Sequence, residues 1–539
     1  MENHMQIQNF IRDTHAYQDV IPKWHPHYLY FTVFASGMTT LAIELSASRL
    51  LGNIYGTSNL VWANIIGLML VYLTVGYFLG GRWADRSPKY STFYRIIIWG
   101  AFLSGIVPLV ARPVLRGAAE AVNDLDAGLA IGSFVGVLIL FSIPVTLLGC
   151  VSPFAIRLAI KEAHDAGKTS GTLYAVSTLG SILGTFAPVL LLIPHLGTAK
   201  TFLTFSGVLL AIGFLGLFLT EGKKVLRLFW MPPGLILLAT FVLSGPTRPA
   251  PDGMKLLYER DSAYNLIQIV EDGDGTRYLL LNEGQGYHSQ WNPNVQFYRR
   301  TWDYFLAAPY FNNAPFTTAD VQNICIIGLA GGTIAHQYTD AYGSIPIDGI
   351  EIDPTIIEAS RQYLDLTMPN LHVIIGDGRY ELNRLDKKYM VVGIDAYRVP
   401  YVPWHLTTQE FFEEVRDHLT ENGVVVINVG RTDTDRRLVE AMTQTMLQVF
   451  PTVHTMDVPD SFNTILVATR QPTVAENLAR NMALLDQSQY PLVFQTLTLA
   501  FQTLVPTQAS NLVFTDDHAP VETIIDDMVI DYLLEGNTP

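Results

Sequence analysis

Seven long apolar runs in the first 243 residues constrain this chain more than any other feature. They lie at about 28–46, 60–79, 94–110, 129–148, 173–193, 202–219 and 226–243. Each is close to the roughly 20 apolar residues that an α-helix needs to cross a bilayer. The last run is interrupted by the adjacent pair Pro232 and Pro233. The sequence therefore predicts a multi-pass α-helical membrane domain of about seven helices over residues 28–243, with the lipid bilayer as a partner.

The charges in the loops predict the orientation of this domain. Lys and Arg gather in the N-terminal tail and in alternate loops, at Arg12, Lys23, Arg82, Arg86, Lys89, Arg95, Arg157, Lys161, Lys168, Lys223, Lys224 and Arg227. The other loops hold only Arg49, Arg112, Arg116 and Lys200. Cytoplasmic loops carry the excess of cations. Residues 1–27 are thus expected to be a cytoplasmic tail of a cell-membrane protein, and seven spans would place the rest of the chain outside the cytoplasm.

The charge balance changes where the apolar runs end. Residues 1–250 hold 17 Lys+Arg against 11 Asp+Glu, whereas residues 251–539 hold 17 against 38. An acidic soluble half disfavours nucleic acid as a partner and suits cationic ligands. The chain has only two cysteines, Cys150 and Cys325, so no disulfide framework or cysteine-metal site is predicted.

A proline-rich linker at residues 244–253, SGPTRPAPDG, separates the two halves. Residues 254–318 then begin with two alternating apolar segments, YNLIQIVED and TRYLLLN, joined by Gly273-Asp274-Gly275. This pattern predicts a β-hairpin region. Residues 319–539 alternate between apolar strands and helical spacing, which predicts an α/β domain.

Four predicted strands of this α/β domain each end in residues suited to a nucleoside site. The first, Ile324–Ile327, runs into the glycines Gly328, Gly331 and Gly332, and the others are followed by Glu351, by Gly376-Asp377-Gly378 and by Asp395. The carboxyl ends of parallel strands form the ligand-binding edge of a Rossmann-like sheet. Glu351 follows the glycines by about 20 residues, where a ribose-binding carboxylate is expected. The series predicts a nucleoside-binding site.

Near the C-terminus stands LVFTDDHAPVET, in which Asp516, Asp517 and Glu522 surround His518. This segment is either a solvated acidic turn or part of the binding site. A single histidine does not predict a metal site, and no metal is expected.

The order of these elements resembles the spermidine synthase (polyamine aminopropyltransferase) family. The matching segments are the hairpin, IIGLAGGTIA, GIEID, IIGDGR, VVGIDAY and PWHLTTQEFF, over about residues 255–470. With the N-terminal spans, the chain is similar to the membrane-anchored bacterial branch, described as fused transporter-like and spermidine synthase-like proteins. TDDHAPVE resembles the C-terminal signature of that branch. The resemblance implies a Rossmann-like domain of the class I methyltransferase type.

The resemblance also implies a reaction, the transfer of an aminopropyl group from decarboxylated S-adenosylmethionine to an amine such as putrescine. Asp395 would be the base that deprotonates the amine. The implied nucleoside-binding residues are Gly328, Gly331, Gly332, Glu351 at the ribose diol, Asp353, and Asp377 with Gly378 at the adenine. The implied amine-side residues are Tyr264 and Asn265, together with Asp516, Asp517 and Glu522 if the acidic segment folds back.

Four segments depart from the family pattern, and one of them, Ser262-Ala263-Tyr264-Asn265 in place of Ser-x-Tyr-Gln, changes no charge. The other three do. Gly331 stands where the glycine loop usually carries an Asp, Arg398 replaces the second Asp of the catalytic loop, and Tyr298-Arg299-Arg300 replaces Tyr-His-Glu. All three changes remove or oppose negative charges that would bind a diamine.

Three hypotheses therefore stay open. The first is the aminopropyl transferase acting on an amine or polyamine. The second is a methyltransferase on the same scaffold, using intact S-adenosylmethionine, which the loss of the acid at Gly331 and the gain of Arg398 would suit. The third is a non-catalytic polyamine-binding or transport-linked protein. The sequence leaves open whether the chain forms a homo-oligomer.

Overall fold

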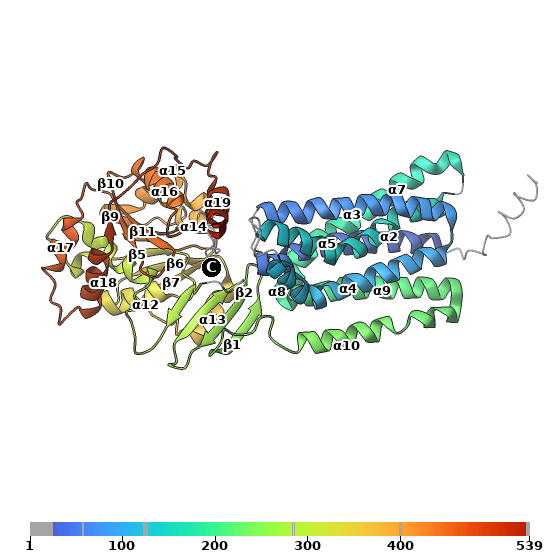
Figure 1. The fold of residues 1–539 in the computed structure, drawn as a ribbon, viewed down its shortest axis with the longest axis horizontal. Helices are drawn as coiled ribbons and strands as arrows, with labels where there is room; N and C mark the ends of the chain where they lie inside the picture. Colours follow the sequence, from blue (N-terminus) through green and yellow to red (C-terminus); the bar gives the residue numbers. More distant parts are fainter. Residues whose placement is uncertain are drawn as a thin grey trace, which may run out of the picture. The chain divides into compact units, whose positions relative to one another are not determined.

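The computed structural model describes residues 25–55, 59–121, 128–160, 162–282, 284, 286–397 and 402–534. The chain divides into two compact units, with the main break between Gly245 and Pro246 (Figure 1). Arg398 and the predicted tail up to residue 24 lie outside the described residues.

The regular structure in the described part of the N-terminal unit is helical. Its long helices are α2 (His25–Tyr55), α3 (Asn59–Arg86), α4 (Tyr90–Ala121), α5 (Gly128–Gly149), α7 (Ala166–Ala187) and α9 (Thr198–Glu221), and its shorter ones are α6 (Val151–Ala159), α8 (Ile193–Leu196) and α10 (Met231–Leu243). Among the described residues, six helices are long and apolar enough to cross a membrane, counting α5 with α6 and α7 with α8 as single spans. These six coincide with the first six predicted runs. The seventh run falls on α10, which has only 13 residues.

Small residues let the helices of this unit approach closely. A Cβ at Gly180 would collide with the carbonyl oxygen of Phe34, and one at Gly184 with that of Met38, so α7 lies directly on the backbone of α2. The Ser181 hydroxyl also donates to the carbonyl of Gly37, at 3.3 Å.

Helix α10 returns along the bundle in the direction of α4. The Trp230 ring lies 6.5 Å from the ring of Trp99 and 5.3 Å from that of Phe102, and Leu235 packs beside Gly105 further along α4. The residue numbers at these contacts increase along both helices, from Trp230 to Leu235 and from Trp99 to Gly105, so the two helices run parallel. Whether α10 completes a seventh crossing stays a prediction, because its 13 residues span only about 20 Å.

The C-terminal unit begins with a four-stranded antiparallel sheet in sequence order. Its strands are β1 (Lys255–Asp261), β2 (Leu266–Glu271), β3 (Arg277–Leu281) and β4 (Ser289–Trp291). The predicted hairpin is the β2–β3 pair, and β1 and β4 extend it on either side. The linker is fixed to this sheet, since Arg248 Nε donates to Gln268 Oε1 at 2.9 Å and the Arg248 N–H donates to Glu259.

An eight-stranded mixed sheet forms the core of this unit, in the order β12-β10-β11-β9-β8-β5-β6-β7. Its strands are β5 (Ile324–Ile327), β6 (Ile347–Glu351), β7 (Leu371–Ile375), β8 (Tyr389–Ile394), β9 (Leu419–Gly430), β10 (Thr452–Asp457), β11 (Asn463–Thr469) and β12 (Leu504–Val505). Strands β7, β6, β5, β8 and β9 are parallel. The chain moves outward in opposite directions from β5 and from β8, which makes the pair a topological switch point.

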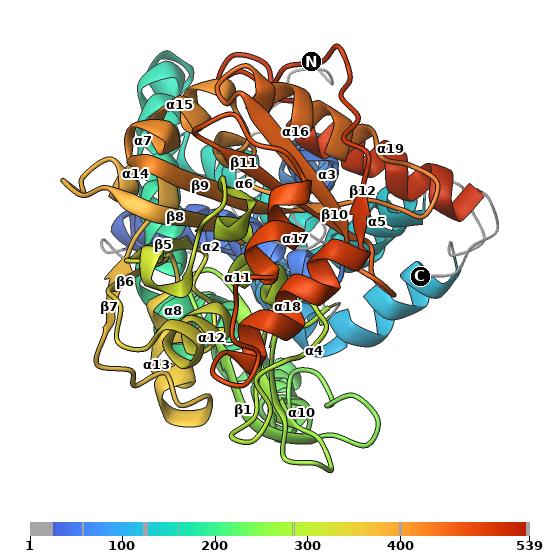
Figure 2. The same ribbon diagram turned by 90° about the vertical axis from the view of Figure 1, so that its left-hand side faces the viewer.

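Helices cover both faces of this sheet (Figures 1 and 2). One face packs on α11 (Thr301–Ala307), α12 (Thr333–Tyr342), α17 (Glu476–Met482) and α18 (Pro491–Gln502). The other packs on α14 (Gly378–Leu382), α15 (Gln409–Asp417), α16 (Arg437–Leu447) and α19 (Val521–Leu534). Helix α13 (Pro354–Tyr363) follows β6. Alternate residues of β5 face the two cores, with Ile324 in one and Cys325 in the other. The Rossmann-like fold predicted from the sequence is thus confirmed.

Candidate functional site

The glycine turn after β5 depends on backbone conformations that favour glycine. Gly328 and Gly332 have φ angles of 88° and 82°. A Cβ at Gly328 would lie 2.6 Å from the carbonyl oxygen of Asp395. Glycine therefore lets the end of β5 and the chain after β8 approach each other at the switch point.

The N–H groups of this turn are all used inside the protein. Gly328 and Leu329 donate to Ile350 O at 3.0 Å each, Ala330 to Glu351 Oε2 at 2.9 Å, Gly331 to Ser289 Oγ at 2.7 Å and Gly332 to Leu329 O at 2.9 Å. The glycines thus shape the floor of the predicted site, and their role toward a nucleoside stays a prediction.

Glu351 ends β6 beside this turn and is only 7% exposed. Its Oε2 accepts the Ala330 N–H at 2.9 Å and its Oε1 accepts the Asp353 N–H at 3.0 Å. Burial raises the pKa of Glu351 to about 7. Because each carboxylate oxygen can accept about two hydrogen bonds, both oxygens keep capacity for a ribose diol.

Asp353 joins the two sheets of the unit. It caps α13 by accepting the Thr355 N–H at 3.0 Å, and its other oxygen accepts the Ser262 hydroxyl at 2.5 Å and the Asn265 side-chain amide at 3.1 Å. Asp353 and Asn265 are therefore bound to each other rather than directed at open space, whereas Tyr264 is 42% exposed. Their roles toward a ligand stay predictions.

Asp377 follows β7 and caps α14. Its Oδ1 accepts the N–H groups of Arg379 and Tyr380, both at 3.1 Å, and its Oδ2 lies 2.9 Å from His405 Nε2. Gly378 is required here because a Cβ would collide with the side chain of Ile327. The predicted adenine residues thus form a compact turn against the end of β5.

Exposed apolar side chains lie next to these carboxylates, and the sequence reading missed them. Ile352 directly follows Glu351 and is 40% exposed, and Ile375 at the end of β7 is 46% exposed. Large aliphatic side chains at the polar edge of a sheet offer a surface for a flat apolar ring. The signal was present in the sequence, as an isoleucine between the two acids of GIEID and another before GDG.

Asp395 lies half-buried at the end of β8 and begins a chain of hydrogen bonds. Asn428 donates its side-chain amide to Asp395 Oδ1 at 3.0 Å, Asn463 donates to Asn428 Oδ1 at 2.8 Å, and the Ser461 hydroxyl donates to Asn463 Oδ1 at 2.6 Å. Trp302 also hydrogen-bonds to Asp395. Burial outweighs these contacts and raises the pKa of Asp395 to about 6.

Ser461 opens onto a cavity of about 520 Å³ at the same edge of the sheet. Its lining includes Arg431, Asp433, Asp457 and Asp460, from the loops after β9 and β10. Asp457 is held by Arg436, with N–O distances of 2.8 and 3.0 Å, which keeps the pKa of Asp457 low. Asp433 and Asp460 are exposed. Arg431 lies 3.6 Å from both Asp433 and Asp457, so the lining holds three acids and one cation, and hydrogen bonds join it to Asp395.

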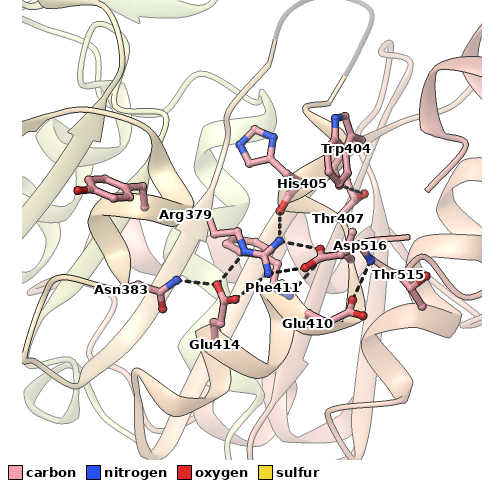
Figure 3. A network of polar contacts seen from close by, with 12 residues as sticks. Arg379, Asn383, Trp404, His405, Thr407, Glu410, Phe411, Glu414, Thr515 and Asp516 are labelled. Carbon is pink, nitrogen blue, oxygen red and sulfur yellow. Dashed lines mark hydrogen bonds and ion pairs between the residues drawn. The ribbon is translucent and has the colours of Figure 1, made fainter. Parts of the chain in front are cut away.

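The acidic C-terminal segment folds back to the residues that follow Asp377, where Asp516 contacts Arg379 (Figure 3). Asp516 accepts two hydrogen bonds from Arg379, at 2.7 and 2.9 Å, and one from the Thr408 hydroxyl at 2.7 Å. Asp517 is exposed, and Glu522 stands in the first turn of α19. The charge of Asp516 is therefore paired with a cation.

The two charge-changing departures within the described residues have different structural settings. A Cβ at Gly331 would lie 2.6 Å from both Leu364 Cδ1 and Ser289 Cβ, so the space for a side chain is closed. Arg300 is exposed and its guanidinium lies 5.1 Å from the ring centre of Tyr287. Among the described residues, no group of three or more His, Cys, Asp or Glu side chains could hold a metal ion.

Comparison with known proteins agrees with this geometry. The family model described as "Spermine/spermidine synthase domain" matches residues 313–470. This segment is a spermine/spermidine synthase domain. It extends from before the glycine turn to the end of β11 and so contains Glu351, Asp377 and Asp395. The predicted resemblance is confirmed for this part of the chain, which carries a transferase domain.

Curated relatives bear related names. The chain is 28% identical over 327 residues to a "Probable polyamine aminopropyl transferase" of Bifidobacterium longum, covering 57% of this chain and 72% of that protein. It is 29% identical over 227 residues to a "Polyamine aminopropyltransferase" of Vibrio vulnificus, covering 40% and 71%. The solved structure of a probable spermidine synthase from Corynebacterium glutamicum aligns with a TM-score of 0.37 and 17% identity, over 49% of this chain and 96% of that one.

The closed space at Gly331 leads to a stability prediction for the synthase domain. Gly331→Asp is expected to lower the free energy of unfolding by about 1–3 kcal/mol, because the new side chain must displace Ser289 or Leu364. The matched control is Gly273→Asp in the β2–β3 turn, where a Cβ meets nothing within 4 Å. Thermal melting of the two variants compares them, and equal melting temperatures would show that the space is open.

Proposed function

We propose that the protein is a membrane-bound transferase that moves an aminopropyl group from decarboxylated S-adenosylmethionine to an amine. The observation that carries the proposal is the placement of Glu351, Asp377 and Asp395 along one sheet edge, with the half-buried Asp395 at the switch point. The synthase domain and the names of the relatives support the same reaction class.

In this reaction the amine nitrogen attacks the aminopropyl carbon bonded to the sulfonium sulfur. A C–N bond forms, the C–S bond breaks, and its electron pair goes to sulfur, leaving neutral methylthioadenosine. The amine must lose a proton, and Asp395 accepts it. A carboxyl group with a pKa of about 6 is ionised at pH 7, yet close enough to that pH to be an effective base.

The acidic cavity beside Ser461 supports an amine as the acceptor. Asp460 is an exposed carboxylate on its rim, and the three acids of the lining outnumber its one cation, Arg431, which lies 3.6 Å from Asp433. The remaining negative charge would attract a cationic amine. The chain Ser461–Asn463–Asn428 then leads to Asp395. This site would take over the negative charge that Gly331 no longer supplies.

The proposed role of Asp395 sets a pH dependence. Its pKa is raised, so the proton stays on until about pH 6, and below that pH the base is lost. We expect kcat/KM for the amine, at saturating donor, to fall about tenfold per pH unit below pH 6 and to be level just above it. Steady-state rates between about pH 5 and pH 8 check this, and a level profile down to pH 5 would count against Asp395 as the base.

The direction of α10 favours a second candidate, a polyamine-binding or transport-linked protein. Helix α10 is parallel to α4, and α4 follows the basic loop containing Arg86 and Lys89. If that loop is cytoplasmic, Leu243 and the domain after it emerge on the other side of the membrane. S-adenosyl donors are made in the cytoplasm, so a domain outside would need an exported donor.

Two experiments separate these candidates. Purified full-length protein is incubated with putrescine and either decarboxylated or intact S-adenosylmethionine, and the nucleoside products are identified. Methylthioadenosine from the decarboxylated donor supports the proposal, and S-adenosylhomocysteine from the intact donor indicates a methyltransferase. No product from either donor, with putrescine or with any other amine tested, overturns both the aminopropyl transferase and the methyltransferase. A reporter fused after residue 539 then reads the membrane side, and a cytoplasmic result favours the enzyme.

A further inference from the structure

The guanidinium of Arg379 is the centre of an ion-pair network that ties the C-terminal segment to the nucleoside side of the sheet (Figure 3). Its Nε and Nη2 donate to the two oxygens of Glu414 at 2.8 and 2.7 Å. Its Nη1 and Nη2 donate to the two oxygens of Asp516 at 2.7 and 2.9 Å. The fifth N–H, on Nη1, donates to the carbonyl of His405 at 3.3 Å. All five donors are used, and the side chain is 17% exposed.

The same network reaches the predicted adenine residue by two routes. Arg379 is the second residue of α14, the helix that Asp377 caps. His405, whose carbonyl Arg379 holds, places its ring nitrogen 2.9 Å from Asp377 Oδ2. Each oxygen of the Asp377 carboxylate therefore has a contact that involves Arg379, one to the Arg379 N–H and one to His405, whose carbonyl Arg379 binds.

The segment before α19 is itself firmly placed. Phe514 is fully buried, its N–H donates to Thr445 Oγ1 at 2.9 Å, and its carbonyl accepts the Gln409 N–H at 2.8 Å. The Asp516 N–H donates to Glu410 at 3.0 Å. Asp516 thus presents its carboxylate to Arg379 from an anchored backbone, and the neighbouring guanidinium holds the pKa of Asp516 below its usual range.

We propose that Asp516 is a positioning residue for the nucleoside site, which it sets through Arg379, His405 and Asp377. This inference rests on the proposed function, since it assumes that Asp377 borders a bound nucleoside. A bidentate carboxylate at residue 516 keeps the guanidinium in one plane, so that its remaining N–H points at the His405 carbonyl. The acidic C-terminal motif then acts from a distance of 137 residues along the chain and makes no contact with the ligand.

The test compares Asp516 with a second acid of the C-terminal segment, by the effect of each substitution on nucleoside binding. Asp516→Asn keeps the size of the side chain and an oxygen for Thr408, but its amide N–H₂ would face the N–H groups of Arg379. We expect the Kd of methylthioadenosine, measured by isothermal titration on the full-length protein, to rise about tenfold. The control is Asp531→Asn, which removes the ion pair of α19 with Arg437 at 2.6 Å and changes a residue with no assigned role in the site. This control should keep the wild-type Kd.

A purely structural role gives a different pattern. Titrations are made well below the melting temperature, so a variant that is only less stable keeps the wild-type Kd. Arg379→Lys keeps the charge but cannot form the two parallel hydrogen bonds to Asp516, so it should also raise the Kd about tenfold. This variant provides the test if Asp516→Asn does not fold. Wild-type protein that binds while both variants bind equally well overturns this inference alone. Wild-type protein that binds no methylthioadenosine overturns the proposed function and this inference together.

Discussion

An Asp395→Asn variant is expected to lose about 10²–10⁴-fold in kcat, the usual contribution of a general base. The amide cannot accept the proton of the attacking amine, although it fills the same space. It can still accept the Asn428 hydrogen bond through its oxygen, so the chain to Ser461 survives. Because Asp395 removes a proton and is not assigned to nucleoside binding, the Kd of methylthioadenosine should change by less than about threefold.

The split between turnover and binding is what identifies the base. Asp386→Asn, at an exposed aspartate in the loop before β8, is the matched control and should leave both quantities unchanged. The slope below pH 6 should also vanish from the residual activity of Asp395→Asn. A variant that turns over at the wild-type rate would remove Asp395 from the reaction, and one that loses nucleoside binding as well would indicate a structural role.

Local patterns in the sequence predicted most of the fold. The glycine turn, the carboxylates at strand ends and the apolar runs each depend on residues within about 20 positions of one another, and the structure has each of them as helices, strands or turns in the expected order. Short strands were harder to predict. Strand β4, for example, has three residues and shows no alternation of apolar and polar side chains. The 13-residue α10 shows the same limit in the membrane half, where length decides between a span and a partial pass.

Contacts between distant residues could not be predicted from such patterns. Ser289 fills the space beside Gly331 from 42 positions away, and Asp353 meets Ser262 across 91 positions. In the sequence, an acid that binds a distant residue of the same chain cannot be told from an acid that faces solvent or a ligand. Asp353 and Asp516 were therefore expected to face ligands, whereas the structure shows them in hydrogen bonds and ion pairs with other residues.

Glu351→Gln is expected to weaken nucleoside binding by about 10²–10⁴-fold. Hydrogen bonds to a charged carboxylate contribute about 1.5–3 kcal/mol each, and a ribose diol would make two. The variant also loses a hydrogen bond inside the protein, because the N–H groups of Ala330 and Asp353 each donate to a different oxygen of Glu351 and glutamine has only one side-chain oxygen. Some loss of stability, about 1–3 kcal/mol, should accompany the loss of affinity.

The pH dependence of binding separates the two effects. The pKa of Glu351 is raised from an unfolded value near 4.5 to about 7, so its contribution to stability is present below about pH 4.5 and is lost as the pH rises through 7. A nucleoside that needs the carboxylate must release this proton, so wild-type affinity should fall about tenfold per pH unit below 7, and the thermal shift caused by methylthioadenosine should be larger at pH 8 than at pH 6. Glu351→Gln should bind weakly at every pH, while Glu358→Gln, at a side chain 68% exposed on α13, should follow the wild-type curve. A wild-type Kd that is constant from pH 6 to pH 8 would mean that the ribose is held elsewhere.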